Sequence, residues 1–208
     1  MAPRIPSLPR EEWTEEALDV ITYWEGPRAL ENGSRSTLTM TLAQHPAMSK
    51  AFYPFGRQLL VHSTLPARQR ELMTLRIAWL CRCEYEWGHH VAWAREAGLS
   101  DEEIAALKLD TDAHPWPDLD CACLRAIDQL RAQNAIDDDV WAVLAGYFDK
   151  RQLMDLVLTI GHYVMLSWAI SAWGTELEPG QGPPNFSLQD PLAGQIVRDG
   201  LDVRKAWD

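Results

Sequence analysis

The side chains best suited to chemistry are concentrated in one stretch, Cys81-Arg-Cys-Glu-Tyr-Glu-Trp-Gly-His-His90. If a helix begins near Glu84, then Cys83, Glu86 and His90 are spaced i, i+3 and i+7 and share one face of it. A carboxylate and an imidazole one turn apart can move protons to and from a bound substrate, which is general acid–base catalysis. Ordinary ion pairs on solvated helices have the same spacing, so the pattern alone leaves both interpretations open.

These residues must be positioned by helices, because the sequence has no run of alternating β-branched residues that would indicate a strand. An unbroken helix from Pro66 to Ala97 would be roughly 48 Å long, more than the roughly 40 Å diameter of a compact chain of this size. We therefore predict a break at Arg82-Cys83-Glu84. After it, Gly98 is expected to end a helix, and Ser100 with Glu103 forms a capping box. The other expected helices are Glu11–Trp24, Pro46–His62, Asp137–Tyr147 and Lys150–Trp173, and the segment Gly26–Ser36 is expected to be a loop. A further helix is expected after Pro117, with Leu119, Cys123, Ile127 and Leu130 on one stripe.

The expected helix Lys150–Trp173 is apolar on all sides, so one neighbouring layer cannot cover it. It is long enough to span a membrane, but it is interrupted by Asp155, His162, Ser167 and Ser171. We therefore interpret it as a buried helix and expect no association with a membrane. A partner subunit is the expected cover. The sequence therefore predicts a homo-oligomer, at least a dimer, with the tail Gly180–Asp208 lying across the partner.

Three runs of the sequence carry a resemblance to a known family. They are Leu65-Pro-Ala-Arg-Gln-Arg-Glu71-Leu-Met-Thr-Leu-Arg76, Cys83-Glu-Tyr-Glu86-Trp87-Gly-His-His90 and Ala94-Arg-Glu-Ala-Gly98-Leu-Ser. Together they resemble the carboxymuconolactone decarboxylase family, which includes the AhpD-type alkylhydroperoxidases. The strong part spans about Leu65–Leu107, and a weaker part includes Asp149–Trp173. The resemblance implies an all-α, AhpD-like fold, frequent assembly into homo-oligomers, and a site at the start of the helix that carries His90.

The sequence departs from the peroxidase branch of that family at one position. That branch uses a Glu, then Cys-x-x-Cys, then a His, and here Glu71, Cys83 and His90 match while Glu86 occupies the second Cys position. Cys81 is the nearby substitute, but two residues apart in a helix point about 200° from each other, a poor disulfide geometry unless the break relieves it. The decarboxylase branch needs no redox pair.

The first functional hypothesis is therefore an enzyme of the decarboxylase, lyase or isomerase type, acting without cofactor or metal on a small cyclic carbonyl, lactone or enolisable metabolite. His90 would be the acid, and Glu86 would be the base or hold the imidazole tautomer. Glu71 would position the imidazole or form an ion pair with Arg68 or Arg76. The expected substrate contacts are Arg76 or Arg82 as an anchor for an anion, with Tyr85 and Trp87 lining an aromatic pocket.

Two other classes of function stay open. One is an alkylhydroperoxidase-like thiol-redox protein that uses Cys83, favoured by a helix N-terminus and opposed by Glu86. The other is a catalytically silent binding protein on the same fold. His89 is expected at the surface or an interface and His162 in the core, and the two Cys-x-Cys pairs lack the spacing of structural zinc sites.

Composition limits the partners further. The 208 residues contain 19 Lys and Arg against 30 Asp and Glu, a formal net charge of −11, with no basic stripe, which excludes nucleic acid as an expected partner. The N-terminus lacks the apolar run of a signal peptide, and four cysteines are too few for a disulfide scaffold, so we expect reduced thiols and a cytoplasmic location. One domain over residues 1–208 is expected, with arms at 1–36 and 176–208.

Overall fold

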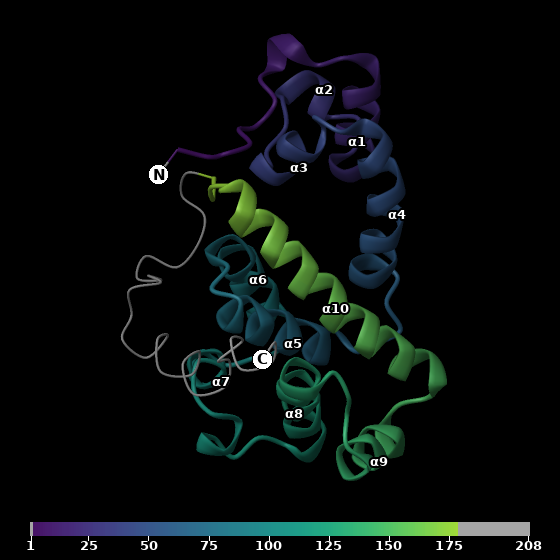
Figure 1. The fold of residues 1–208 in the computed structure, drawn as a ribbon, viewed down its shortest axis with the longest axis vertical. Helices are drawn as coiled ribbons and strands as arrows, with labels where there is room; N and C mark the ends of the chain where they lie inside the picture. Colours follow the sequence, from purple (N-terminus) through teal and green to yellow (C-terminus); the bar gives the residue numbers. More distant parts are fainter. Residues whose placement is uncertain (1, 179–208) are drawn as a thin grey trace, which may run out of the picture. The chain divides into compact units, whose positions relative to one another are not determined.

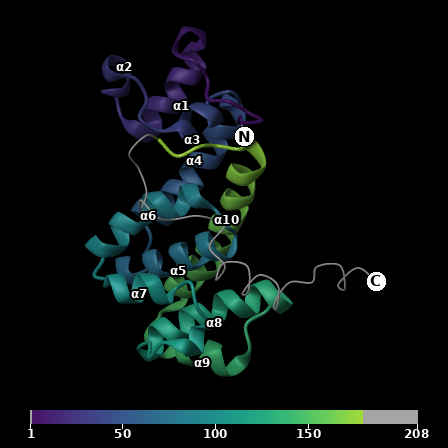
Figure 2. The same cartoon turned by 90° about the vertical axis from the view of Figure 1, so that its left-hand side faces the viewer.

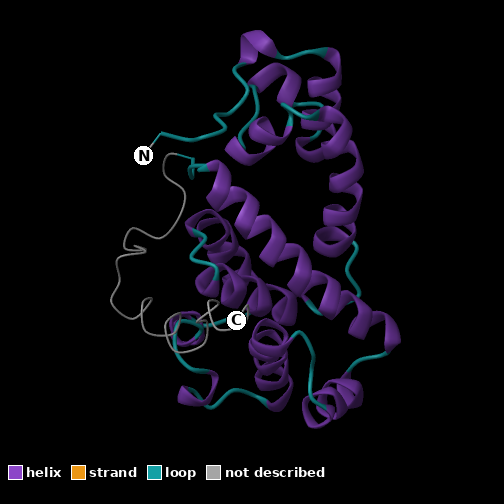
Figure 3. Cartoon of the chain, in the orientation of Figure 1, coloured by secondary structure: helices purple, strands orange, loops and turns teal. Residues whose placement is uncertain are grey.

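The computed structural model describes residues 2–178, and the regular elements among them are all helices (Figures 1 and 3), which confirms the predicted all-α class. The helices are η1 (Arg10–Glu12), α1 (Glu15–Glu25), α2 (Ala29–Asn32), α3 (Thr37–Leu42), α4 (Pro46–Val61), α5 (Ala67–Leu80), α6 (Glu84–Glu96), α7 (Asp101–Ala106), η2 (Thr111–Ala113), α8 (Asp118–Gln133), α9 (Asp138–Tyr147) and α10 (Lys150–Trp173).

The described chain divides into two compact units. The first comprises residues 2–62 and 168–178, and the second comprises residues 63–167. The single domain expected from the sequence stays a prediction, and most of the tail expected to cross a partner lies outside the described residues. The reactive stretch belongs entirely to the second unit.

In the first unit, α1 packs against α3 and α4 around Ile21, Leu42 and Tyr53. The expected start of this helix at Glu11 is wrong: α1 begins at Glu15, because the hydroxyl of Thr14 caps it by accepting from the backbone N–H of Ala17 at 3.2 Å. The expected loop Gly26–Ser36 also contains the short helix α2.

In the second unit, α5 and α6 lie side by side, and α8 packs against both α5 and α9 (Figure 2). Every residue of α5 from Glu71 to Leu80 is buried, so this helix has core on all of its faces. A helix surrounded in this way holds its polar side chains in an apolar environment, where each needs a partner.

The predicted break between the two helices is confirmed at Arg82. This residue has a φ of 56°, in the left-handed region, and α6 starts two residues later with Cys83 at its N-cap. The backbone N–H of Cys83 donates to the carbonyl of Ala78 at 2.8 Å, which satisfies one carbonyl at the end of α5. The turn reverses the chain so that residues of α5 and α6 can share one site.

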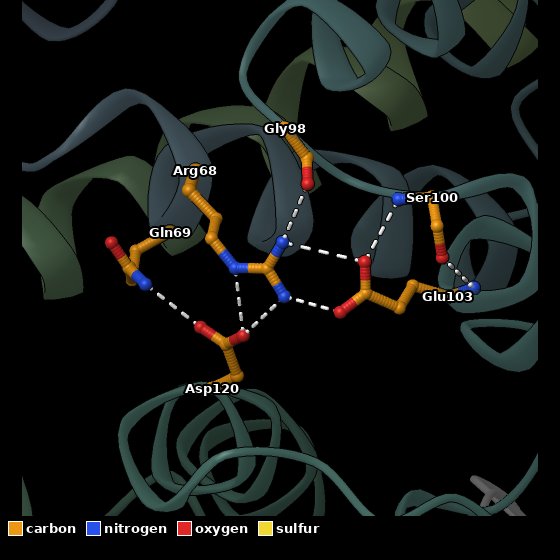
Figure 4. Close-up of polar contacts among 6 residues, drawn as sticks. All are labelled: Arg68, Gln69, Gly98, Ser100, Glu103 and Asp120. Carbon is orange, nitrogen blue, oxygen red and sulfur yellow. Dashed lines mark hydrogen bonds and ion pairs between the residues drawn. The ribbon is translucent and has the colours of Figure 1, made fainter.

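A polar network fixes the beginning of α5 against two other helices (Figure 4). The guanidinium of Arg68 donates to the buried carboxylate of Asp120 on α8 at 2.7 and 2.9 Å, and to Glu103 on α7. Gln69 donates to the other oxygen of Asp120 at 2.8 Å. Because Glu103 also completes the predicted capping box with Ser100, the network joins α5, α7 and α8 one turn before Glu71.

The long apolar helix α10 has the bounds expected from the sequence and ends at Gly174, which has a φ of 71°. By length and composition it is the one helix of residues 2–178 that is suited to crossing a membrane, and half of its most apolar stretch is buried within the chain. Its other face exposes apolar side chains in the second unit, namely Met154, Val157, Leu158 and Met165.

Candidate active site

Glu71 and His90 meet between α5 and α6. Oε2 of Glu71 lies 2.7 Å from Nδ1 of His90, and both side chains are almost fully buried. The two residues are 19 positions apart, and the turn at Arg82 brings their helices together. A carboxylate at this distance fixes the orientation of the ring and its Nδ1–H.

Glu86 occupies the other edge of the same ring. Its Oε2 lies 3.3 Å from Nε2 of His90, one helical turn along α6, as the sequence predicts for a helix that begins at Glu84. Glu86 is in the first turn of α6, where the helix dipole favours a negative charge. Both ring nitrogens of His90 therefore face carboxylate oxygens.

This arrangement sets the charge of His90. Burial acts to lower its pKa, but the bonds to Glu71 and Glu86 favour the charged ring and together raise the pKa to about 9. At neutral pH the ring is therefore an imidazolium with both N–H groups donating. A buried cation of this kind can serve as a proton donor at a pH where an ordinary histidine is mostly neutral.

Arg70 completes the charge balance of the site. Its Nε lies 3.1 Å from Oε1 of Glu71, the oxygen that does not contact His90. The sequence offered Arg68 or Arg76 as the ion-pair partner of Glu71, and the structure gives its neighbour Arg70. Two cations and two carboxylates then sum to zero, which reduces the cost of burying Glu71 and Glu86.

Two aromatic rings flank the imidazolium edge-on. The ring centroid of Trp93 lies 4.8 Å from that of His90, and that of Tyr163 on α10 lies 5.2 Å away. Trp93 is 40% exposed whereas Tyr163 is buried, so His90 lies one side chain below the surface of the second unit on the Trp93 side. Neither residue was predicted; Trp93 follows His90 by three positions, a helical spacing that could have indicated it.

Cys83 is in the same part of the structure but is poorly suited to be a thiolate. Its side chain is buried at the N-cap of α6. Burial raises the pKa of the thiol to about 12, and the nearby charge of Glu86 acts in the same direction. At neutral pH Cys83 is therefore protonated.

The structure corrects the expectation that Arg76 anchors an anionic substrate. Its buried guanidinium donates to the carbonyl of Leu107 at 2.9 Å, to that of Leu109 and to the carboxylate of Asp128 at 3.2 Å. These contacts are all internal and hold the chain that follows α7. Arg82, by contrast, is exposed on the turn between α5 and α6, and its role as an anchor stays a prediction.

The two predicted aromatic contacts lie in different surroundings. Trp87 is 2% exposed and packs in the core against Trp79, with the ammonium of Lys108 over its ring, an environment that indicates a packing role. Tyr85 is buried with its ring centroid 4.6 Å from that of His89, which is half-buried. Its contact with a substrate stays a prediction.

His162 is buried in α10, where burial lowers its pKa. Over residues 2–178 the structure has no cluster of three or more His, Cys, Asp or Glu side chains arranged for a metal ion.

Comparison with solved structures shows the fold. An uncharacterised peroxidase-related protein from Silicibacter sp. TM1040 is 17% identical, with a TM-score of 0.69 over 86% of this chain and 95% of that one. A peroxidase-related protein from Ralstonia eutropha JMP134, described as an alkylhydroperoxidase AhpD core, is 17% identical with a TM-score of 0.67 over the same shares. A cysteine-to-alanine variant of the debrominase Bmp8, in complex with 2,3,4-tribromopyrrole, is 14% identical with a TM-score of 0.64 over 96% and 97%.

Comparison of the sequence with family models gives a match over part of the chain. Comparison with curated proteins gives no match. Residues 46–129 match the model of the carboxymuconolactone decarboxylase family, and this segment contains Glu71, Cys83, Glu86 and His90. This segment is therefore similar to the carboxymuconolactone decarboxylase family, and the fold of the chain is all-helical and AhpD-like.

Proposed function

We propose that this protein is an acid–base enzyme that needs no cofactor and acts on a small cyclic carbonyl, lactone or enolisable acid. One observation carries the proposal: the two ring nitrogens of His90 contact carboxylates from two helices, Glu71 at 2.7 Å and Glu86 at 3.3 Å. An acid and a base are thereby held side by side in a buried site. The family region supports an enzymatic role of this type.

The two contacts of the ring suit different tasks. The short contact to Glu71 keeps the ring oriented and positively charged. The longer contact joins Nε2 and Glu86, and a substrate oxygen can bind between these two groups. Nε2–H then donates to the oxygen on which charge develops, while Glu86 is placed to remove or return a proton at the adjacent carbon.

For a decarboxylation, the bond to the carboxylate carbon breaks and CO₂ leaves. The electron pair of the broken C–C bond passes into the carbonyl group of the substrate. The enolate oxygen that results is stabilised by Nε2–H of His90. The carbon is then protonated, and the proton lost from the site is replaced from water. For an isomerisation, Glu86 moves one proton from carbon to carbon, with no net change in the site.

The test is a panel of small lactones, β-keto acids and unsaturated lactone acids followed by NMR in D₂O. 2,3,4-Tribromopyrrole is included because the debrominase neighbour is crystallised with it. At least one panel member should lose CO₂ or gain deuterium at carbon, and Glu86→Gln and His90→Gln should each slow this by about 10²-fold or more.

The matched control is Glu84→Gln, because Glu84 is an exposed residue in the same first turn of α6. This variant should keep the rate of the unmodified protein. Equal, measurable rates in all four proteins would contradict the roles given to Glu86 and His90. No turnover of any panel member would contradict the proposal and favour a catalytically silent binding protein.

A hydroperoxidase that uses Cys83 as its attacking thiolate is less well supported. The thiol is buried, its pKa is raised to about 12, and a carboxylate occupies the position of the second family cysteine. Rapid alkylation of Cys83 at neutral pH, without loss of reactivity in the His90→Gln variant, would favour this alternative.

A further inference from the structure

The turn between α5 and α6 carries two thiols with an unusual relation to each other. Cys81 is the C-cap of α5 and Cys83 is the N-cap of α6, and Arg82 between them has a φ of 56°. Within a helix, residues two apart point about 200° away from each other. The left-handed residue breaks that relation and leaves two cysteines separated by only two Cα–Cα steps of 3.8 Å each.

The two thiols share one neighbour on α10. The hydroxyl of Ser167 on α10 is close enough to both thiols to oppose the effect of burial, which raises the pKa of each. Ser167 is itself fully buried, and within residues 2–178 its Oγ has no partner that meets the geometry of a hydrogen bond. A single small side chain therefore borders both sulfurs.

The two thiols differ in access and in charge. Cys81 is half-buried, and Nη1 of Arg131 donates to its Sγ at 3.3 Å, a contact that stabilises a thiolate. Cys83 is buried and lies next to Glu86. The accessible thiol thus has a cation beside it, and the inaccessible thiol lies within one turn of the chain.

We propose that Cys81 and Cys83 form a reversible dithiol–disulfide pair that exchanges with small disulfides, with Cys81 as the attacking thiol. This assignment is independent of the acid–base function, and it reverses the expectation that Cys83 is the reactive sulfur. A disulfide across one intervening residue is strained, so we expect it to be easily reduced, as catalytic or regulatory disulfides are.

The exchange takes place in two balanced steps. The thiolate of Cys81 attacks one sulfur of a small disulfide RSSR, the S–S bond breaks, and RS⁻ leaves with the electron pair. Cys83 then loses its proton to water as its sulfur attacks Sγ of Cys81 and expels the second RS⁻. The two protons lost from the cysteines are taken up by the two thiolates released, so that protein(SH)₂ and RSSR give a protein disulfide and two RSH.

The chain contains its own control. Cys121 and Cys123 have the same Cys-x-Cys spacing and a similar pattern of exposure, half-buried and buried. They lie inside the continuous helix α8, so their side chains keep the helical divergence. If sequence spacing alone decided reactivity, both pairs would react alike; if the turn decides it, only the first pair will.

The experiment equilibrates the full chain with glutathione buffers of increasing GSSG content, traps free thiols with N-ethylmaleimide and maps peptides by mass spectrometry. We expect an intramolecular disulfide between Cys81 and Cys83, reversed by excess GSH, and none between Cys121 and Cys123. Cys83→Ser should stop at a glutathione adduct on Cys81, and Cys81→Ser should give no adduct on Cys83. Arg131→Gln should slow the first step several-fold.

Each variant is first checked for the helical circular dichroism spectrum of the unmodified protein. Should Cys83→Ser not fold, the unmodified protein still decides the matter, because a trapped adduct on Cys81 at early times identifies the attacking thiol. Two results would overturn the proposal: no Cys81–Cys83 disulfide at any GSSG content, or equal oxidation of the pair in α8.

Discussion

Glu71 and His90 are joined by a 2.7 Å contact between Oε2 and Nδ1, although they lie on different helices and are both almost fully buried. The contact makes the pKa of His90 depend on a residue of α5. It also makes the charge of His90 depend on folding, because the ion pair exists only when α5 and α6 are packed together.

The first prediction concerns stability and pH. Despite burial, the contacts with Glu71 and Glu86 raise the pKa of His90 to about 9 from 6.5. The charged ring therefore stabilises the folded state fully below about pH 6.5, and this contribution is lost as the pH rises through about 9. Urea unfolding should show the free energy of unfolding falling by up to about 3 kcal/mol over that window. His90→Gln should lack this decrease, and an identical pH dependence in both proteins would contradict the assigned charge.

The second prediction concerns activity and pH. If the imidazolium is the acid, kcat/KM on the substrate found in the panel should fall with an alkaline limb near pH 9. In Glu71→Gln the ring loses one carboxylate, so the limb should move toward neutral pH and the rate at pH 8 should drop. A limb that stays in place in this variant would show that His90 is not the titrating acid.

The third prediction concerns the network at the start of α5. Arg68→Met leaves the carboxylate of Asp120 buried without its cation, which should cost about 3–5 kcal/mol of stability. The matched control is Arg95→Met, which removes an exposed ion pair with Asp101 and should cost at most about 1 kcal/mol. Denaturant unfolding of the two variants measures both values, and equal losses would contradict the structural role of Arg68.

The fourth prediction is the homo-oligomer expected from α10. Met154, Val157, Leu158 and Met165 form an exposed apolar stripe, and a Cβ placed on Gly161 within it would meet open space, which allows close approach of a second helix. We propose that a second copy of this chain covers the stripe. Light scattering at micromolar concentration should show at least a dimer. Met165→Glu should dissociate this dimer, whereas Ala145→Glu, a control at another exposed position, should leave it intact. A monomeric unmodified protein would refute it.

Features that depend on neighbours in the sequence were predicted correctly. Gly98, Ser100 and Glu103 lie within six consecutive positions, and Glu86 and His90 are one turn apart, so local spacing was sufficient. Chain length also indicated the break between α5 and α6, because one straight helix over both would be longer than a compact chain of this size.

Features that depend on packing between distant residues could not be predicted from local sequence spacing. Tyr163 reaches His90 from 73 positions away. Arg76 is of a residue type that is usually exposed and can anchor an anion. Only its contacts with Leu107 and Asp128 show that its side chain faces inward. Because α5 is buried on all of its faces, it has no polar stripe to reveal which charged residues meet Glu71.

The contacts of Glu71 and Glu86 with its two ring nitrogens require that His90 is an imidazolium at neutral pH. The most direct measurement is an NMR titration of the ¹⁵N-labelled His90 ring in the unmodified protein, Glu71→Gln and Glu86→Gln, with His90→Gln identifying the resonance. We expect a pKa near 9 for His90 in the unmodified protein and a lower pKa in each glutamine variant. A pKa at or below the ordinary value of about 6.5, unchanged by either substitution, would contradict it.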